Sequence, residues 1–315
     1  MNTPELVVSA VPHTHSGNTL QKMMRQILLA LIPALLIGVA YFGFGVVQVA
    51  VIAVVSAVVW QALLQKLMHK PVVFGNMTTI VAAVLLAMIV PPGLPWWTMC
   101  VGTLIMVLLG TEIYGGYGNN PFNGVLIAWV VLQISFPEAM TAWAYPPGEL
   151  LTIQPPLQVL QEDGVFFVKE FFSLSDLLVG RTVGYAGQTS ALFLLLGGLF
   201  LLYRRVITWH IPVSFLAGVA AFAGLFWLLD AEAYASPVVH ILAGGTMITA
   251  FFLATDYPSS PVTKAGMLLY GFGAGMLTVV IRIWGQWPDG AFFAVFLLSI
   301  LTPLLDKIAP RVYGR

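Results

Sequence analysis

The sequence has very little charge. Only 8% of its 315 residues are Asp, Glu, Lys or Arg, whereas a soluble domain has about 25%. Acidic and basic residues are equal in number, so the formal net charge is zero. This composition excludes an ordinary soluble fold, and it contains no basic excess that would indicate a nucleic-acid partner.

Cysteine is almost absent as well. The single cysteine, Cys100, lies inside an apolar run. Because an iron–sulfur cluster needs four thiolates, this chain alone cannot hold one, and a disulfide within the chain is also excluded. No metal motif, nucleophile–base pair or Walker-type loop is present, and His13 and His15 form at best a weak site, so no metal is expected. The first 20 residues lack the apolar core of a cleavable signal peptide.

Apolar residues, in contrast, make up 59% of the chain. In lipid every backbone polar group has to be satisfied internally, so this composition predicts an all-α polytopic membrane protein. A membrane span needs roughly 20 apolar residues. Ten intervals are candidates for spans, with soft boundaries: 26–42, 45–65, 77–92, 97–113, 122–136, 190–203, 211–229, 237–254, 265–283 and 290–305.

The distribution of Lys and Arg predicts the orientation. With the N-terminus in the cytoplasm, three basic residues fall outside: Lys169, Arg181 and Arg282. The inner side receives the others, Lys22, Arg25, Lys66, Lys70, Arg204, Arg205, Lys264, Lys307, Arg311 and Arg315. This bias follows the positive-inside rule and places both termini in the cytoplasm of a bacterium, with the acidic segment before Thr189 in the periplasm.

The sequence also contains an internal repeat. A shift of 167 residues superimposes identical residues at seven positions: Trp60 on Trp227, Thr79 on Thr246, Ala83 on Ala250, Ala87 on Ala254, Pro91 on Pro258, Gly118 on Gly285 and Pro121 on Pro288. With five spans in each half, the two repeats would be inverted in the membrane, an arrangement that places ligand sites near the pseudo-symmetry axis. The predicted parts are a cytoplasmic segment 1–25, a first repeat 26–136, a periplasmic loop 137–189, a second repeat 190–306 and a cytoplasmic C-terminus 307–315.

A polar loop meets an apolar run at Thr189 and Ser190, which follow Gly187 and Gln188. Two hydroxyls before an apolar run suit the N-cap of a helix. The N–H groups at such a helix start also favour a phosphate. Local chemistry therefore predicts an N-cap at Thr189, with covalent modification of Thr189 as the alternative.

Two other stretches carry candidate binding residues. The segment 115–124 combines glycines, which allow close backbone approach to a flat ligand, with Asn120 and Asn123, whose amides can bond ring carbonyls and nitrogens; a tight helix connection is the alternative. Asp256 lies at a broken helix end and is a candidate for ion handling, the alternative being a solvated acid that caps the next helix. Four other charged residues near span ends are interpreted as interfacial: Glu112, Asp230, Arg282 and Asp306.

The order and spacing of several short motifs resemble the D-type subunit of the bacterial Rnf electron-transport complex, a family related to the B-type subunit of the sodium-pumping NADH:quinone oxidoreductase. The motifs run along nearly the whole chain: Pro12-His-Thr-His-Ser-Gly17, Tyr114-Gly-Gly-Tyr-Gly-Asn-Asn-Pro-Phe-Asn123, Ile134-Ser-Phe-Pro137, Gly187-Gln-Thr-Ser-Ala191, Arg204-Arg-Val-Ile-Thr-Trp-His-Ile-Pro212, Ala254-Thr-Asp256 and Pro288-Asp-Gly290.

The resemblance implies ten spans in two inverted halves. It also implies FMN joined through its phosphate to a threonine at the start of the sixth span, which matches Thr189, with Gly187, Gln188 and Ser190 as neighbours. A periplasmic flavin transferase would attach this FMN. A second, non-covalent flavin such as riboflavin is implied within the membrane, and segments 119–123 and 255–258 are candidate walls for it.

The function expected from this resemblance is that of a flavin-carrying membrane subunit in a redox-driven ion pump. The complex would pass electrons between ferredoxin and NAD and couple this to the export of Na⁺ or H⁺ across the bacterial inner membrane. The chain has no nicotinamide motif and no cluster ligands, so its partners would be the other Rnf-type subunits, the transferase and membrane lipid. Inverted halves with broken helices also fit a transporter or channel for a small solute, and a structural scaffold is a third alternative.

Overall fold

The structure, a computed structural model, describes residues 19–70, 77–143 and 154–308. Within these ranges every regular element is a helix, which confirms the predicted all-α fold. The motif 12–17, with His13 and His15, and the basic residues Arg311 and Arg315 lie outside the described ranges.

Four helices are long and apolar enough to cross a membrane: α1 (Leu20–Phe42), α2 (Phe44–Leu67), α12 (His210–Leu229) and α15 (Lys264–Trp284). At 1.5 Å per residue, about 20 residues match the roughly 30 Å hydrocarbon core of a bilayer. Shorter apolar helices accompany them: α3 (Thr78–Met88), α4 (Trp96–Val107) with the π-helix η1 (Leu108–Glu112), α5 (Gly124–Ser135) and α11 (Ala191–Tyr203). These helices confirm a polytopic membrane protein.

The prediction of one continuous span over 237–254 is wrong, because the helix is interrupted there. It consists of α13 (Pro237–Leu242), α14 (Thr246–Ile248) and the π-helix η2 (Thr249–Leu253), with residues 243–245 between α13 and α14. Gly244 has a φ of +68°, which interrupts the helix. The last predicted span is also interrupted, into α16 (Ala291–Ser299) and α17 (Thr302–Leu305).

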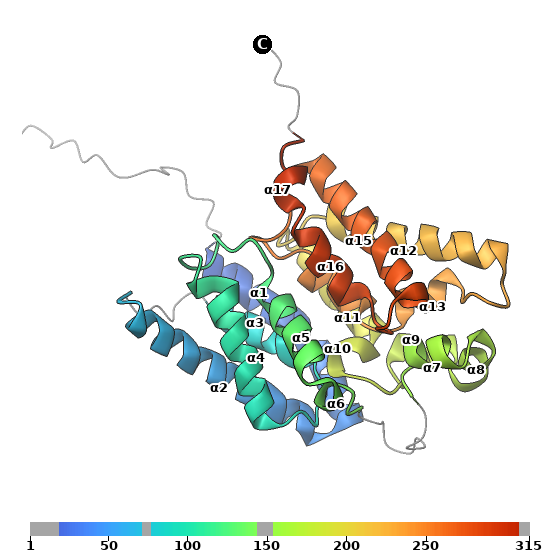
Figure 1. Cartoon of the computed structure of the whole chain (residues 1–315), viewed down its shortest axis with the longest axis horizontal. Coiled ribbons are helices and arrows are strands. Elements are labelled where there is room, and N and C mark those ends of the chain that lie inside the picture. Colours follow the sequence, from blue (N-terminus) through green and yellow to red (C-terminus); the bar gives the residue numbers. More distant parts are fainter. Residues whose placement is uncertain (1–18, 71–76, 144–153, 309–315) are drawn as a thin grey trace, which may run out of the picture.

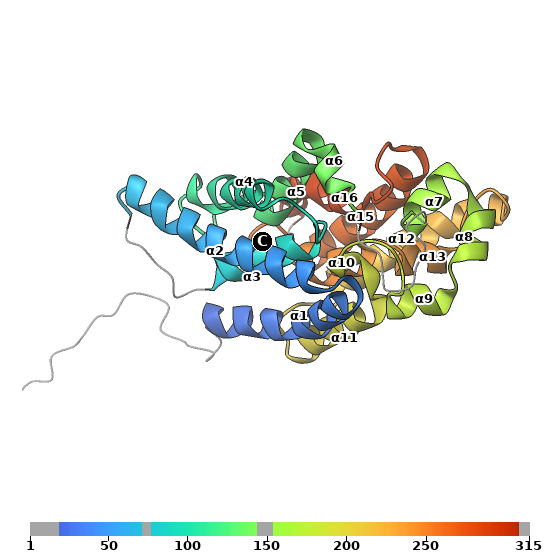
Figure 2. The same ribbon diagram turned by 90° about the horizontal axis from the view of Figure 1, so that it is seen from below.

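The segment between the halves contains several short helices. They are α6 (Pro137–Met140), α7 (Pro156–Glu162), α8 (Val165–Phe171), α9 (Leu174–Val179) and α10 (Ala186–Thr189). Leu157, Val168 and Leu177 form a small hydrophobic core together with Val239 and Ala243 from the region of α13. Helices α7 to α9 lie side by side in both views (Figures 1 and 2). This segment is therefore packed onto the second half of the chain.

The two halves share much of their packing pattern. In the first half α2 contacts α3 and α4, and α4 contacts α5; in the second half α12 contacts η2 and α15, and α15 contacts α16. The halves meet through α1 against α11 and α5 against α16, and Figure 2 shows α1 beside α11. Helices α5 and α16 start at Gly124 and Ala291, which are 167 residues apart. The repeat in sequence thus corresponds to a repeat in packing, while its inversion in a membrane remains a prediction.

Candidate functional site

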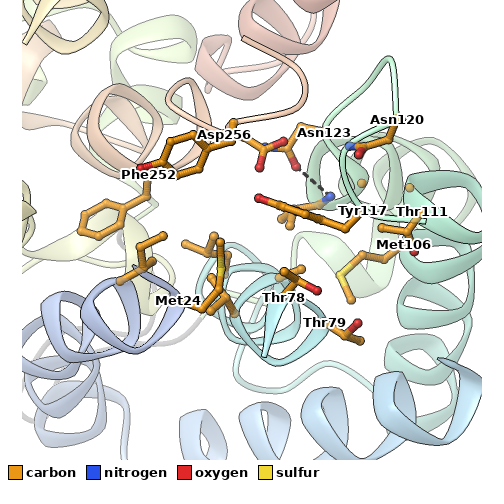
Figure 3. Close-up of a pocket in the computed structure, with 18 of the residues that line it drawn as sticks. Met24, Thr78, Thr79, Met106, Thr111, Tyr117, Asn120, Asn123, Phe252 and Asp256 are labelled. Atoms are coloured by element: carbon orange, nitrogen blue, oxygen red, sulfur yellow. Dashed lines mark hydrogen bonds between the residues drawn. The ribbon is translucent and has the colours of Figure 1, made fainter. Parts of the chain in front are cut away.

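A cavity lies between the two halves, where α1, α3, η1 and η2 converge (Figure 3). We call it the interhalf cavity, and its polar and bulky lining residues include Met24, Thr78, Thr79, Met106, Thr111, Tyr117, Asn120, Asn123, Phe252 and Asp256. Both π-helices contribute to the lining, η1 through Thr111 and η2 through Phe251 and Phe252. Single π-turns in helices are frequent at functional sites.

The two predicted asparagines shape one wall of this cavity. Asn123 accepts a hydrogen bond from the N–H of Val125 at 2.9 Å and so caps α5. Its amide also donates to the carbonyl of Leu253 at 3.1 Å, which ties the first half to the end of η2. Asn120 accepts from the N–H of Gly118 at 3.2 Å and donates to the carbonyl of Phe122 at 2.9 Å. Both side chains therefore fix the connection before α5.

Asp256 reaches the same cavity from the connection between η2 and α15. Its carboxylate accepts a hydrogen bond from the hydroxyl of Ser259 at 2.9 Å. Burial raises the pKa of Asp256 to about 6, although the hydrogen bond from Ser259 acts in the opposite direction. The alternative that Asp256 caps the next helix is wrong, because Thr263 caps α15 by accepting from the N–H of Gly266.

A second cavity is lined in part by aromatic and amide side chains. We call it the glutamine–aromatic cavity, and it includes Trp129, Trp143, Tyr185, Trp287, Gln133, Gln158, Gln161, Gln188, Gln286 and Asp289. The rings of Trp143 and Tyr185 are stacked, with centroids 5.0 Å apart. The indole N–H of Trp129 donates to the carbonyl of Ile89 at 3.0 Å, which fixes the orientation of that ring. Stacked rings and amides suit a flat heteroaromatic ligand.

Thr189 directly follows a residue of the second cavity, and its surroundings differ from the prediction. The N-cap of α11 is Ser190, whose hydroxyl accepts from the N–H of Phe193, and Thr189 is the last residue of the one-turn helix α10. The predicted N-cap is thus wrong by one residue. The side chain of Thr189 is buried, with the residue only 1% exposed, and its hydroxyl donates to the carbonyl of Ala186 at 3.3 Å.

Two charged residues interpreted as interfacial are in fact buried. Glu112 is 3% exposed and pairs with Lys70 at 3.3 Å, while Gln65 donates to its second oxygen at 2.9 Å. Arg282 is 5% exposed and pairs with Asp289 at 3.1 Å. The interfacial interpretation is therefore wrong for Glu112 and Arg282. Burying a charge is costly unless it is paired, and both carry a partner.

Asp289 is a residue that sequence reasoning missed. It lies in the glutamine–aromatic cavity and accepts a hydrogen bond from the amide of Gln188 at 3.0 Å. The sequence did contain a signal for Asp289. The motif Pro288-Asp-Gly290 places a carboxylate shortly after Arg282, which lies at the end of a predicted span, and a carboxylate is the natural partner of an arginine there. Gln188 is consequently bound to the second half of the chain.

The chain matches the NQR2, RnfD, RnfE family over residues 7–314. It belongs to this family. It is similar to the D-type subunit of the Na(+)-translocating ferredoxin:NAD(+) oxidoreductase complex of Acetobacterium woodii, at 36% identity over 100% of this chain and 97% of that protein. It is also similar to the D-type subunit of the ion-translocating oxidoreductase complex of Escherichia fergusonii, at 37% identity over 98% of each chain. The protein of the same description from Halorhodospira halophila is 36% identical over 97% of this chain and 95% of its own length.

In this member of the NQR2, RnfD, RnfE family the predicted site residues fall into two groups. Asn120, Asn123 and Asp256 meet at the interhalf cavity. Gln188 lines the glutamine–aromatic cavity and is followed directly by Thr189 and Ser190. The first turn of α5 lines the interhalf cavity, whereas Trp129 and Gln133, further along the same helix, line the other. The structure therefore separates the two groups along α5.

Proposed function

We propose that this chain is the D-type membrane subunit of an ion-translocating oxidoreductase complex that passes electrons between ferredoxin and NAD. The observation that carries the proposal is the similarity over almost the full length to relatives described in these terms. The chain would work with the other subunits of such a complex, since it has too few thiolates for a cluster.

The glutamine–aromatic cavity is the proposed location of an FMN held through its phosphate on Thr189. Its stacked rings and amide side chains fit the isoalloxazine ring, and Gln188 connects the cavity to Thr189 in the sequence. The hydroxyl of Thr189 fits less well in this conformation, because it is buried and donates to Ala186. A bound flavin would supply the electron chemistry, while the protein orients the ring and excludes water.

The interhalf cavity is the proposed location of a second, non-covalent flavin. Segments 119–123 and 255–258 both contribute to its walls through Asn120, Asn123 and Asp256. Phe252 offers an apolar face, and Thr78 and Thr79 offer hydroxyls to a polar ring edge. These groups would position a flavin by contacts that need no covalent bond.

Asp256 is the proposed group for handling the transported cation or proton. Neither of the two ion pairs found between described residues includes Asp256. A carboxyl with a pKa near 6 exchanges protons readily close to neutral pH. It also offers an oxygen to a cation that enters the interhalf cavity.

The covalent flavin is tested by fluorescence on a denaturing gel. The full chain is expressed in a bacterium that contains the flavin transferase, beside Thr189→Val and the matched control Ser190→Ala. We expect a fluorescent band near 34 kDa for the original chain and for Ser190→Ala, and no fluorescence for Thr189→Val, which keeps the side-chain shape but loses the hydroxyl. Equal fluorescence in Thr189→Val would place the bond elsewhere, and three dark lanes would reject covalent attachment.

A further inference from the structure

The break between α13 and α14 is filled by an ion pair from a distant part of the chain. The last carbonyls of one helix and the first N–H groups of the next lack helical partners. Arg282 donates to the carbonyls of His240 at 2.6 Å and Ala243 at 3.3 Å. Asp289 accepts from the N–H of Gly245. A cation at a helix C-terminus and an anion at a helix N-terminus match the helix dipoles, so the pair stabilises the break.

The same carboxylate also holds Gln188. One oxygen of Asp289 accepts from both Gly245 and the amide of Gln188, and the other accepts from Arg282. The side chain of Arg282 is 1% exposed and that of Asp289 is 11% exposed, so water competes little for these bonds. Helix α10 is thus bound through one side chain to the break in the second half.

Helix α10 is packed closely on its other sides. A Cβ atom on Gly180 would lie 2.8 Å from the backbone of Thr189 and of Ser190, and one on Gly187 would lie 2.7 Å from the carbonyl oxygen of Met88. Such distances leave no space for an added group. The backbone of Gly180 therefore lies against Thr189 and that of Met88 against Gly187 in the same short helix, which agrees with the burial of Thr189.

We propose that Asp289, positioned by Arg282, holds α10 against the second half of the chain through Gln188. Thr189 becomes accessible only when the hydrogen bond between Gln188 and Asp289 breaks and α10 moves away. Asp289 and Arg282 are in this sense positioning residues for the Thr189 site. The identity of the group that reacts with Thr189 rests on the proposed function, but the position of α10 against the second half does not.

The test measures the accessibility of position 189 without any flavin. Thr189→Cys is introduced together with Cys100→Ser, which removes the only native thiol, and the purified full-length chain is labelled with a maleimide reagent under native conditions. We expect slow labelling while the contact is intact. Adding Gln188→Leu removes the donor and leaves the ion pair in place, and labelling should become about tenfold faster or more, since hydrogen bonds to charged groups are among the stronger ones.

A charge exchange provides a second, independent measurement. Gln188→Glu places another carboxylate beside Asp289, so we expect fast labelling from repulsion. Combining Gln188→Glu with Asp289→Asn restores one acid and one amide across the contact, and labelling should return towards the slow rate. Restoration of this kind would not follow if the substitutions merely weakened the fold.

The matched control is Glu112→Gln, which disrupts the ion pair with Lys70 at a separate site in the first half of the chain. We expect it to leave the labelling rate unchanged even if it lowers thermal stability. Unchanged labelling in Gln188→Leu and Gln188→Glu would overturn the proposal, as would equal acceleration by Glu112→Gln. If Asp289→Asn prevents folding, the two Gln188 variants still decide the outcome. Labelling needs no flavin transferase. A negative result in this test can therefore be distinguished from a lack of flavin fluorescence in the gel test of the proposed function.

Discussion

Among the described residues that line its cavity, Asp256 is accompanied by tyrosines and by no basic side chain. Tyr117 and Tyr257 line the interhalf cavity with it, and the hydroxyl of Ser259 donates a hydrogen bond to its carboxylate. Burial therefore disfavours the charged carboxylate and raises its pKa to about 6. A phenol cannot neutralise that charge as an ammonium or guanidinium group would, so we expect a proton or a cation from solution to supply the counter-charge.

This position predicts a pH-dependent stability. The native pKa of Asp256 lies above that of the unfolded chain, so the native state binds more protons between about pH 4 and pH 6, and its contribution to stability falls as the pH rises through that window. Asp256→Asn should stabilise the detergent-solubilised protein by about 1–3 kcal/mol at pH 7.5 and by clearly less at pH 4.5, where the native carboxyl is already protonated. Thermal unfolding at both pH values measures the difference. An equal change in stability at the two pH values would show that ionisation of the Asp256 carboxyl is not the cause.

The charged residues also show which features of individual residues could not be predicted from the sequence. Low charge density correctly predicted a membrane protein, but it did not distinguish a buried charge from an interfacial one. Arg282 and Asp289 are only seven positions apart, yet the groups they bind at His240 and Gln188 lie some 40 and 100 residues earlier. Partners at such separations become visible only when helices are packed. The sequence also could not decide which of Thr189 and Ser190 is the N-cap of α11. These residues are adjacent, and neighbouring hydroxyls offer the same local chemistry.

At the scale of elements, a very close approach between helices in the first half involves two glycines. A Cβ atom on Gly110, in η1, would lie 2.6 Å from the Cα of Gly124, at the start of α5. Small residues allow membrane helices to approach each other closely in this way. Since Gly110 and Gly124 both line the interhalf cavity, their contact helps set the shape of that cavity.

Gly110→Ala should therefore destabilise the protein. The added methyl group has to push η1 away from α5, which we expect to cost about 1–3 kcal/mol. The matched control is Gly93→Ala, because a Cβ atom there meets nothing within 4 Å; that change should stay within about 0.5 kcal/mol. Melting temperatures of both variants in detergent give the comparison. Equal melting temperatures would mean that the two helices separate without cost.

The positions of the elements were predicted well, but their interruptions were not. Apolar length located the intervals, since a helix in lipid needs a run of that length. The break at 243–245 was missed although Gly244 and Gly245 stand there, because glycine is tolerated inside membrane helices and does not by itself end one. Its stabilising groups, Arg282 and Asp289, belong to later elements. The two π-helices left no recognisable pattern in the sequence.

At the scale of the whole molecule, the repeat places equivalent helices against each other. Helix α1 contacts α11, and α5 contacts α16, while each half keeps its own internal pattern. Figure 1 shows α1 to α5, in blue to green, beside α12 to α17, in orange to red. The offset of 167 residues relates the members of each pair, but it did not predict that they would contact each other.

The predicted orientation can be measured by labelling in intact cells. Two variants in the Cys100→Ser background, Asp163→Cys and Arg204→Cys, place thiols at exposed positions on the predicted outer and inner sides. A membrane-impermeant maleimide should label the first in cells with a permeabilised outer membrane, and the second only after lysis. This expectation follows from the distribution of Lys and Arg. The reverse result would invert the orientation and place Thr189 in the cytoplasm.

Helix α5 has a further consequence for how the two cavities can communicate. Asn123 at its start belongs to one cavity and Gln133 to the other, so at 1.5 Å per residue they are separated by about 15 Å of helix. Trp129 is packed edge-on against Phe292 and Phe293 in between. An electron can tunnel through packed protein of this kind, whereas a hydrated cation needs an open path. If flavins occupy both ends, we expect electrons to cross this packed region without the ion, so that electron transfer and ion transport are coupled mechanically or electrostatically rather than through a shared passage.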